Sequence, residues 1–389
     1  MYISILGRQP TLGMAELEKL FSDTAWFGKY SAIFEADNPD ITELGGSQKL
    51  GLVTIENSGR KWQDVSVKIV QEYYSILKRS QGKITLGISA YGFDGVNPRD
   101  IQKTGIILKN KLKSEGVSLR LIPNQDPALS TATSHHNKLG LSDNKIELLV
   151  VSSGSGKIIV AESIGSQNIT AYASRDQARP KRDAFVGMLP PKLAQIMINL
   201  ALVEQKSPSV TLLDPFCGTG VILQEAALKG LSVYGTDLAE KMVSYSRENL
   251  EWLSKTHHVT FNSELHTGNA IDTKWQQPIN LVVTESYLGQ PFSAPPSWPK
   301  LTEVMGNCDN IITAFLRNVG SQLAPGTPLC IAVPAWKQVD GSFSHLPIVD
   351  TLGKYGYKPH EFKNVSKNEL LYFREDQVVA RELLVMTKA

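Results

Sequence analysis

Seven residues in the middle of the chain have the composition of a turn that binds a small cofactor. The turn from Asp214 to Gly220, DPFCGTG, follows an apolar run and precedes a stretch with helical spacing. Glycines at its end allow backbone amides to approach a ligand closely, because no Cβ intervenes. A β-branched strand, a glycine-rich turn and a helix start are how an α/β sheet binds a nucleoside cofactor at the end of its first strand.

The residues around this turn favour S-adenosylmethionine (SAM) over a dinucleotide or an ordinary β-α turn. A second predicted strand, Leu231 to Thr236, ends in Asp237, whose carboxylate can accept hydrogen bonds from both hydroxyls of a ribose. Dinucleotide folds use Gly-x-Gly-x-x-Gly, and Leu223 occupies the place of the third glycine. We therefore predict SAM as the cofactor and nine residues that bind it: Pro190, Asp214, Phe216, Gly218, Gly220, Asp237, Asn269, Ala270 and Asp272.

Two groups of these residues are predicted from their place in the chain. Asn269 or Asp272 would lie where a third strand ends, from which a side chain can hydrogen-bond an adenine amino group. Pro190 and Pro191 can begin a helix without wasting an amide, since the donors of the first turn lack partners within the helix. We expect this helix, Pro191 to Val203, to lie against the open side of the cofactor pocket.

The elements that must position the turn alternate along the second half of the chain. Strand-like runs alternate with helical patterns, and the last portion supplies edge strands. The pattern predicts a doubly wound, Rossmann-like α/β domain whose mostly parallel sheet has an antiparallel end. The predicted strands are residues 210–213, 231–236, 279–283 and 329–333, and the predicted helices are residues 221–229, 240–253 and 302–323.

The first half of the chain reads as α+β structure without a residue cluster suited to catalysis. Residues 1–80 resemble a small architectural module, with a helix from Trp62 to Lys78. Residues 81–170 combine β-strands with a basic helix that bears Lys103, Lys109 and Lys113, which favours a binding role. In the polar stretch 124–144, the pair His135 and His136 lacks an acid or thiol at metal-ligand spacing, so a surface loop is the better interpretation.

Composition indicates an ordinary globular protein. The chain has 389 residues, 42% of them hydrophobic and 20% charged, which suggests two or three domains. Sparse cysteine indicates a reducing compartment, and no apolar run is long enough for a membrane, so we expect a cytoplasmic protein. The formal net charge is only +2, yet residues 95–182 hold 13 Lys or Arg against 7 Asp or Glu. This local excess predicts a polyanionic partner, with solvated helix faces as the alternative.

A basic linker precedes the predicted cofactor domain. It contains four cationic residues that we predict to contact RNA phosphates, although pairing with nearby acids is an equally weighted alternative: Arg175, Arg179, Lys181 and Arg182. We expect the domain boundaries at residues 1–80, 81–170 and 171–389, with the linker in the last part.

The chain resembles the tRNA guanine-N2 methyltransferases that carry a THUMP domain and make N2-methylguanosine at tRNA position ten. The resemblance lies in the segments 5–10 (ILGRQP), 179–183 (RPKRD), 190–194 (PPKLA), 214–220 and 373–382. It implies a ferredoxin-like part over residues 1–80, a THUMP RNA-binding domain over residues 81–170, a SAM-dependent methyltransferase domain and tRNA or another structured RNA as the partner. It leaves open a small activating protein subunit and gives no membrane partner.

The same resemblance places the catalytic residues after the fourth strand, at Glu285, Ser286 and Tyr287. Family members usually have Asp-Pro-Pro-Tyr there, whereas this chain reads Glu-Ser-Tyr-Leu. A guanine amine is a weak nucleophile, so a carboxylate and a backbone carbonyl must polarise its N–H bonds while an aromatic ring stacks on the base. Glu285 can supply the carboxylate and Tyr287 the ring, but without prolines the loop loses backbone stiffness.

Three functions remain open at this point. The first is a tRNA guanine-N2 methyltransferase. The second is a DNA amino methyltransferase that acts on adenine or cytosine, which the basic module before the cofactor domain disfavours. The third is a catalytically silent RNA-binding protein that keeps a SAM pocket, which the altered loop after the fourth strand makes plausible.

Overall fold

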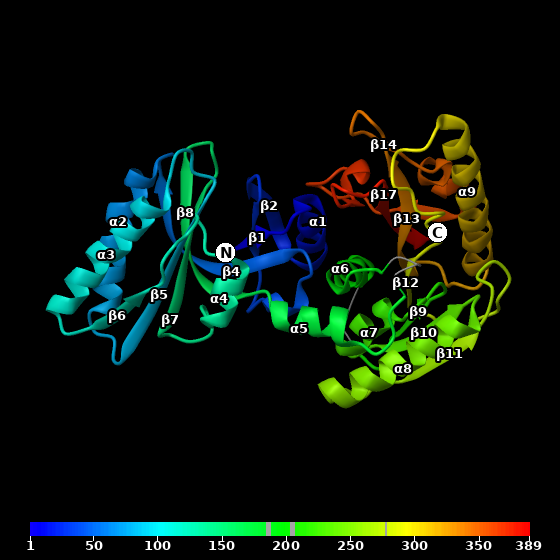
Figure 1. Cartoon of the computed structure of the whole chain (residues 1–389), viewed down its shortest axis with the longest axis horizontal. Coiled ribbons are helices and arrows are strands. Elements are labelled where there is room, and N and C mark those ends of the chain that lie inside the picture. Colours follow the sequence, from blue (N-terminus) through cyan, green and yellow to red (C-terminus); the bar gives the residue numbers. More distant parts are fainter. Residues whose placement is uncertain (184–187, 203–206, 277) are drawn as a thin grey trace. The chain divides into compact units, whose positions relative to one another are not determined.

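The computed structural model describes residues 1–183, 188–202, 207–276 and 278–389 (Figure 1). The chain divides into two compact units, Met1–Ala171 and Tyr172–Ala389. Within these described ranges, no helix is long and apolar enough to cross a membrane.

The first unit is built on one eight-stranded sheet with the order β2-β3-β1-β4-β8-β7-β5-β6. Strand β5 runs parallel to β6 and β7, whereas β4, β7 and β8 pair antiparallel. The strands are β1 (Tyr2–Leu6), β2 (Ser22–Gly28), β3 (Ser31–Glu35), β4 (Ser47–Ser58), β5 (Lys83–Tyr91), β6 (Ser118–Leu121), β7 (Lys145–Ser152) and β8 (Lys157–Ser166). Strands from both of the parts predicted before and after residue 80 therefore share this sheet, and that boundary stays a prediction.

Two neighbouring helices, α2 (Trp62–Leu77) and α3 (Pro98–Ser114), cover one end of this sheet (Figure 1). The helix predicted from Trp62 to Lys78 is confirmed, and Val65, Ile69, Tyr73 and Leu77 form a buried stripe along it. Helix α3 begins where the Asn97 side chain accepts hydrogen bonds from the amides of the first turn, and this cap fixes the helix start. Its lysines lie on the solvent side of the helix.

The remaining helices of this unit include one that the sequence did not indicate. Helix α1 (Pro10–Leu20) matches the predicted spacing after Thr11. Residues Thr131–His136 form helix α4, where a surface loop was expected, because the Ser130 hydroxyl caps the amide of Thr133. The interpretation of His135 and His136 as loop residues was therefore wrong, since both end this helix. Strand β2 was also missed, and its mixed exposure explains the weak pattern.

The second unit has a nine-stranded sheet, and the path of its main strands is β11-β10-β9-β12-β13-β17-β15. The first five strands on this path are parallel, and β17 runs antiparallel to β13 and β15. The predicted Rossmann-like α/β fold with an antiparallel end is confirmed. The strands are β9 (Thr211–Asp214), β10 (Ser232–Asp237), β11 (Ser263–Thr267), β12 (Leu281–Glu285), β13 (Pro328–Lys337), β14 (Phe343–Ser344), β15 (Tyr357–Pro359), β16 (Leu371–Tyr372) and β17 (Val379–Lys388).

Helices cover both faces of this sheet (Figure 1). One face carries α6 (Pro191–Ala201), α7 (Val221–Leu228) and α8 (Glu240–His257), and the other carries α9 (Trp298–Gly320). The core under α9 includes Ile312, Phe315 and Val319, which are completely buried. Helix α6 begins at Pro191 as predicted, and its predicted last residue, Val203, lies outside the described residues. The third strand, β11, ends at Thr267, two residues before Asn269.

Candidate active site

The glycine turn has the backbone geometry that its sequence predicted. Gly218 and Gly220 have φ angles of 51° and 77°, in the left-handed region that favours glycine. A Cβ at Gly220 would lie 2.8 Å from Ser246 Oγ, so close packing against α8 also requires glycine there. A Cβ at Gly218 would meet only the Phe216 carbonyl oxygen at 3.9 Å, so space for a ligand is open above this residue.

Asp237 ends β10 and closes onto the turn. Its Oδ2 accepts a hydrogen bond from the Gly218 amide at 2.9 Å, and its Oδ1 accepts one from the Ala239 amide at the same distance. The carboxylate is therefore held beside the glycine turn, with lone pairs that remain for other donors. This is the position that a ribose-binding acid needs.

Asp214 lies beneath the turn rather than on its surface. The residue is 2% exposed. Its Oδ1 accepts hydrogen bonds from the Thr284 hydroxyl at 2.6 Å and from the Phe216 amide at 3.3 Å. Burial raises the pKa of Asp214 to about 7, against the lowering effect of these two hydrogen bonds. Asp214 thus links the end of β9 to the end of β12.

Two large apolar side chains are exposed at the strand ends that carry the predicted adenosine-binding residues. Leu238, directly after Asp237, is 73% exposed, and Ile271, between Ala270 and Asp272, is 41% exposed. Apolar side chains in these positions can pack against the adenine of a cofactor. Neither residue was predicted from the sequence, and only Leu238 had a local signal, as an apolar residue directly after the strand-ending Asp237.

The predicted residues after β11 have different surroundings. Asn269 Oδ1 accepts a hydrogen bond from the Ile271 amide at 3.3 Å, and Asp272 is exposed. Ala270 is 3% exposed and belongs to the core, although its backbone lies between Asn269 and Ile271. Only the backbone of Ala270 is therefore placed to contact a cofactor.

The start of the unit is tied to the glycine turn through Asn249 on α8. The Asn249 side chain accepts a hydrogen bond from the Lys181 amide at 2.9 Å and donates to the Lys181 carbonyl at 3.0 Å. It also donates to the carbonyl of Thr219 at 2.8 Å. One buried amide therefore joins the basic linker to the turn. Pro190 directly precedes α6 and is partly buried.

The predicted catalytic residues follow β12, the strand next to β9. Glu285 forms an ion pair with Arg381 of β17. Ser286 is buried, and both its amide and its hydroxyl donate to the carbonyl of Ala332 at 2.9 Å. Tyr287 is 47% exposed. The loop therefore presents one carboxylate and one aromatic ring, while the serine fixes its backbone to β13.

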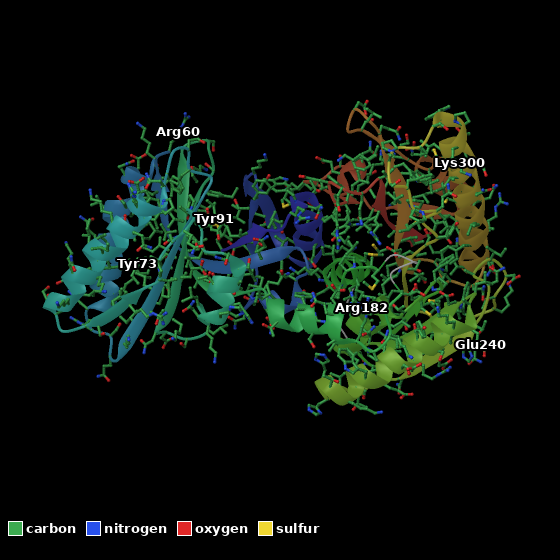
Figure 2. The ribbon with its side chains drawn as sticks, viewed as in Figure 1. Arg60, Tyr73, Tyr91, Arg182, Glu240 and Lys300 are labelled. Atoms are coloured by element: carbon green, nitrogen blue, oxygen red, sulfur yellow. The ribbon has the colours of Figure 1, made fainter. Side chains whose placement is uncertain are left out.

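The predicted RNA-binding residues divide by exposure. Lys103, Lys109, Lys113 and Arg182 are exposed, and Figure 2 labels Arg182. Lys181 pairs with Glu248 at 3.2 Å, whereas Arg175 pairs with Glu225 at 2.6 Å and is largely buried. Arg179 is 3% exposed, and its guanidinium has no hydrogen-bond partner among the described residues. The exposed group is the one that can reach phosphates without rearrangement.

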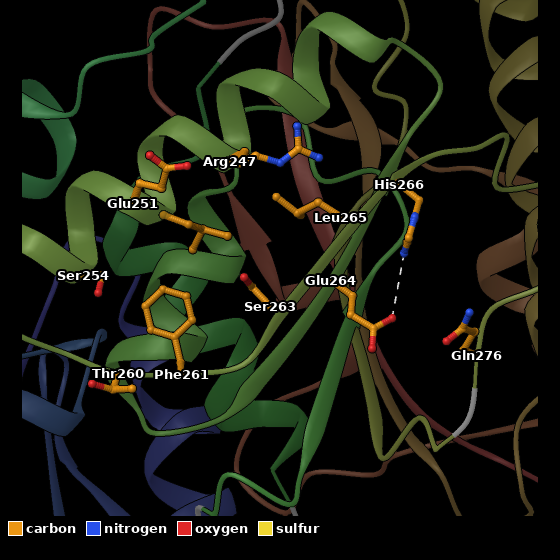
Figure 3. Close-up of a pocket in the computed structure, with 11 residues that line it drawn as sticks. Arg247, Glu251, Ser254, Thr260, Phe261, Ser263, Glu264, Leu265, His266 and Gln276 are labelled. Carbon is orange, nitrogen blue, oxygen red and sulfur yellow. Dashed lines mark ion pairs between the residues drawn. The ribbon is translucent and has the colours of Figure 1, made fainter.

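A cavity of about 660 Å³ lies between α8 and β11 and contains none of the predicted cofactor residues (Figure 3). Arg247 and Glu251 line it from the helix, and Glu264 and His266 line it from the strand. The His266 ring and the Glu264 carboxylate approach to 3.8 Å, and both side chains are 55% exposed. This cavity is separate from the glycine turn, and its groups form no catalytic set.

Comparison with known proteins identifies the domain that holds this site. Residues 179–308 match the family described as UPF0020, RMKL-like, methyltransferase domain. Part of the second unit therefore matches a methyltransferase domain. SAM is the cofactor of this class of enzyme, and the cofactor prediction is confirmed at that level.

Relatives confirm the resemblance to the tRNA guanine-N2 methyltransferases. The tRNA (guanine(10)-N2)-dimethyltransferase of Methanothermobacter thermautotrophicus is 32% identical over 167 residues, 42% of this chain and 45% of that protein. The enzyme of the same name from Pyrococcus abyssi is 31% identical over 168 residues, 42% of this chain and 43% of that protein. The chain therefore matches less than half the length of these relatives.

Solved structures extend the likeness in fold to the whole chain. The crystal structure of TrmN from Thermus thermophilus has a TM-score of 0.53 and 16% sequence identity, and it covers 100% of this chain and 99% of that one. At this identity the likeness concerns the fold. The fold of the chain is thus shared with a known structure.

The residues at the turn fit SAM. Space above Gly218, the carboxylate of Asp237 and the apolar side chains of Leu238 and Ile271 match an amino-acid moiety, a ribose and an adenine in sequence along the sheet edge. Bound SAM would supply an electrophilic methyl group. The roles of the individual residues stay predictions.

Proposed function

We propose that this protein transfers a methyl group from SAM to the exocyclic N2 of a guanine in tRNA. The observation that carries the proposal is the place of Glu285. Its carboxylate stands at the end of β12, beside the strand whose end forms the glycine turn. Two relatives named tRNA (guanine(10)-N2)-dimethyltransferase support the same substrate, although the match covers less than half of each relative's length.

The catalytic loop can act on the amine in two ways. A carboxylate oxygen of Glu285 accepts a hydrogen bond from an N–H of the guanine amine. This hydrogen bond directs the lone pair of the nitrogen out of conjugation with the ring and toward the methyl group. The exposed ring of Tyr287 can stack on the base and fix its plane. The N–C bond then forms as the C–S bond breaks, the sulfur keeps the electron pair, and the amine proton leaves to the carboxylate or to water.

The first unit is proposed to bind the tRNA. Its exposed lysines on α3 form a basic face suited to phosphates, in agreement with the expected ferredoxin-like and THUMP-like parts. Arg182 extends the exposed cationic groups to the linker. A tRNA substrate and three cysteines that are all free fit a cytoplasmic protein.

The experiment is methyl transfer from labelled SAM to tRNA transcripts, followed by mass spectrometry of the nucleosides. We expect N2-methylguanosine or its dimethyl form. A matched transcript with inosine at the modified position lacks only the 2-amino group and should accept no label. Glu285→Gln should lose turnover and keep the affinity for SAM.

Other outcomes would decide against this function. Label on adenine or cytosine, with tighter binding to duplex DNA than to tRNA, would indicate a DNA amino methyltransferase. Binding of tRNA and SAM without any transfer would indicate a catalytically silent RNA-binding protein.

A further inference from the structure

The carboxylate of the catalytic loop is paired with a cation from a distant part of the chain. Glu285 at the end of β12 and Arg381 near the start of β17 form an ion pair through Glu285 Oε1 and Arg381 Nε. The two residues are 96 positions apart in the sequence.

The sheet register explains how the pair forms. Glu285 lies opposite Ala332 of β13, and Pro334, two residues further on the same strand, lies opposite Arg381. Side chains two residues apart point to the same face of a sheet. The small Ala332 therefore leaves the space over β13 through which the guanidinium reaches the carboxylate.

The ion pair is largely shielded from solvent, but Arg381 contacts only one of the two carboxylate oxygens of Glu285. The Arg381 side chain is 9% exposed and the Glu285 side chain is 16% exposed, so water competes only weakly for either charge. Arg381 contacts the carboxylate through one nitrogen and one oxygen. Among the described residues, none donates a hydrogen bond to the second oxygen, Glu285 Oε2. One lone-pair-bearing oxygen is therefore left for a substrate.

We propose that Arg381 is a positioning residue for methyl transfer, which fixes Glu285 Oε1 so that Oε2 accepts the N–H of the target amine. The inference rests on the proposed function. The side chain of a glutamate can rotate about several bonds, whereas methyl transfer requires its carboxylate in one position. A charge-assisted hydrogen bond to one oxygen restricts the position of the other oxygen. The two hydrogen bonds from Ser286 to the Ala332 carbonyl restrain the backbone directly after Glu285.

Two other roles for Arg381 would give different results in the same experiment. If Arg381 held Glu285 away from the substrate, removal of the guanidinium would raise the rate. If Arg381 only stabilised the fold, its removal would lower the melting temperature without changing the rate constant of the folded fraction. The rate constant of methyl transfer therefore distinguishes these roles.

The experiment measures single-turnover methyl transfer at saturating SAM and tRNA for the full chain, Arg381→Ala and Arg381→Lys. We expect Arg381→Ala to lower the rate constant about a hundredfold, the order of magnitude for a misplaced catalytic group. The Kd for SAM and the KM for tRNA should stay within about threefold. Guanidinium ion, added below unfolding concentrations, should restore part of the rate of Arg381→Ala.

Two further variants keep the test decisive. Arg381→Lys keeps the charge with a single point of contact, and it should fold and retain an intermediate rate even if Arg381→Ala does not fold. The matched control is His345→Ala. His345 Nδ1 lies 2.8 Å from the carboxylate of Glu382, which follows Arg381 on β17, and His345 does not contact Glu285. This control should keep the rate of the unaltered chain.

The outcomes separate the two proposals. An unchanged or raised rate constant in both Arg381 variants overturns the positioning role while the proposed function stands. A wild-type chain that transfers no methyl group to guanine N2 overturns the proposed function, and the positioning role with it. That result is seen without any variant.

Discussion

Leu238 and Ile271 show at the scale of single residues how the structure adds to a motif. Both expose apolar surface where neighbouring strands end, and neither belongs to the hydrophobic core. An adenine between them would cover this surface. Their contribution to affinity would then be the free energy of burying apolar area, which requires no hydrogen bond from either residue.

We expect Leu238→Ser to weaken SAM binding about tenfold or more, since burial of one leucine side chain contributes roughly 1.5–3 kcal/mol. The melting temperature without SAM should not change, because the side chain is 73% exposed. Isothermal titration calorimetry gives the Kd. The control is Leu141→Ser in the first unit, at a side chain that is 64% exposed. Equal affinities in all three proteins would exclude Leu238 from the site.

Asp214 makes the stability of the chain depend on pH. Its folded pKa of about 7 exceeds its ordinary value of 3.8, so the folded state binds a proton more tightly than the unfolded state between these values. Proton binding by Asp214 therefore adds to the free energy of unfolding. This contribution is fully present below about pH 3.8, falls as pH rises and is lost above about pH 7. Asp214→Asn keeps an acceptor for Thr284 without an ionisable group.

Melting temperatures of the two proteins, measured from about pH 5 to about pH 8, check this sign. The unaltered chain should lose stability relative to Asp214→Asn as pH rises through that window. Parallel curves would show that Asp214 does not titrate there.

At the scale of elements, Asn249 of α8 joins the linker to the glycine turn by three hydrogen bonds. Asn249→Ala leaves the buried partners of this amide unpaired, at a cost of about 1–3 kcal/mol for such a group. We expect a lower melting temperature and weaker SAM binding, because the Thr219 carbonyl loses its donor. The control Asn124→Ala in the first unit removes three similar hydrogen bonds, to the carbonyls of Ile88, Asp126 and Pro127. It should affect stability without the same loss of affinity.

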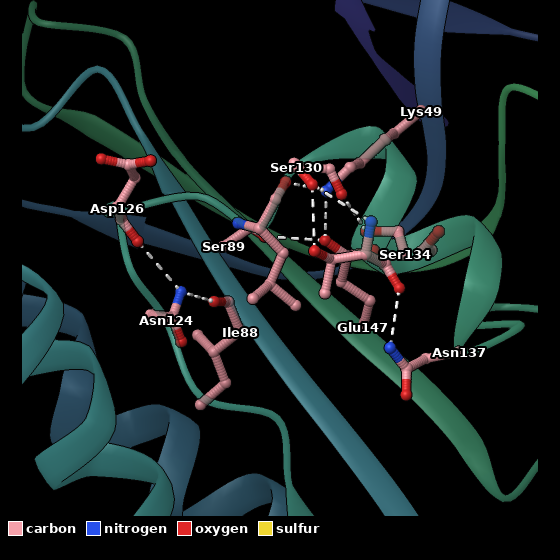
Figure 4. A network of polar contacts seen from close by, with 12 residues as sticks. Lys49, Ile88, Ser89, Asn124, Asp126, Ser130, Ser134, Asn137 and Glu147 are labelled. Carbon is pink, nitrogen blue, oxygen red and sulfur yellow. Dashed lines mark hydrogen bonds and ion pairs between the residues drawn. The ribbon is translucent and has the colours of Figure 1, made fainter. Parts of the chain in front are cut away.

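A second buried connection joins β4 to β7 in the first unit (Figure 4). Lys49 and Glu147 form an ion pair, with exposures of 1% and 0%. Lys49 also donates to the Leu129 carbonyl at 2.8 Å, and Ser89 donates to Glu147 at 2.7 Å. The network thereby fixes the segment that leads into α4 against the sheet.

We expect Lys49→Met to destabilise the first unit by about 3–5 kcal/mol, because it leaves a buried carboxylate without its cation. The double variant Lys49→Met/Glu147→Leu should recover most of this loss. Urea denaturation measures each free energy of unfolding. Additive effects of the two substitutions would contradict the coupling.

These elements also show what sequence could predict. The helix predicted from Trp62, the glycine turn and the mostly parallel second sheet with an antiparallel end follow from local spacing, and the structure confirms them. The pair of Glu285 with Arg381 depends on the register of three strands, and the burial of Arg179 depends on packing against other elements, so neither has a local signal. Helix α4 was missed because six residues give too few periods to distinguish a helix from a loop.

At the scale of the whole molecule, a nearly neutral chain carries its cationic groups unevenly. Lys103, Lys109 and Lys113 of α3 are exposed, whereas Arg175 is paired with Glu225 and Arg179 is buried. Electrostatic binding of tRNA would then depend on the first unit, with a salt dependence set by the number of phosphates it contacts.

We expect Lys103→Gln, Lys109→Gln and Lys113→Gln together to weaken tRNA binding. The slope of log Kd against log salt concentration should fall by about one for each lost phosphate contact. Filter binding over a range of salt checks this result. Lys255→Gln and Lys300→Gln, at lysines that pair with acids on their own helices, serve as the control. An unchanged slope in the triple variant would place the RNA elsewhere.

The antiparallel pairing of β13 with β17 has a consequence for how such a chain can vary. Residues 338–378 leave the sheet after β13 and return to it at β17, and the register of these two strands alone sets Pro334 opposite Arg381. Changes of length at exposed turns of this excursion, such as residues 339–341, would change the outline of the domain without moving the guanidinium relative to Glu285. Its buried residues, among them Leu346, Ile348 and Leu352, belong to the core and hold the rest of the excursion in place. These exposed turns are therefore where the chain can change in length while the strand pairing that brings Arg381 to Glu285 is kept.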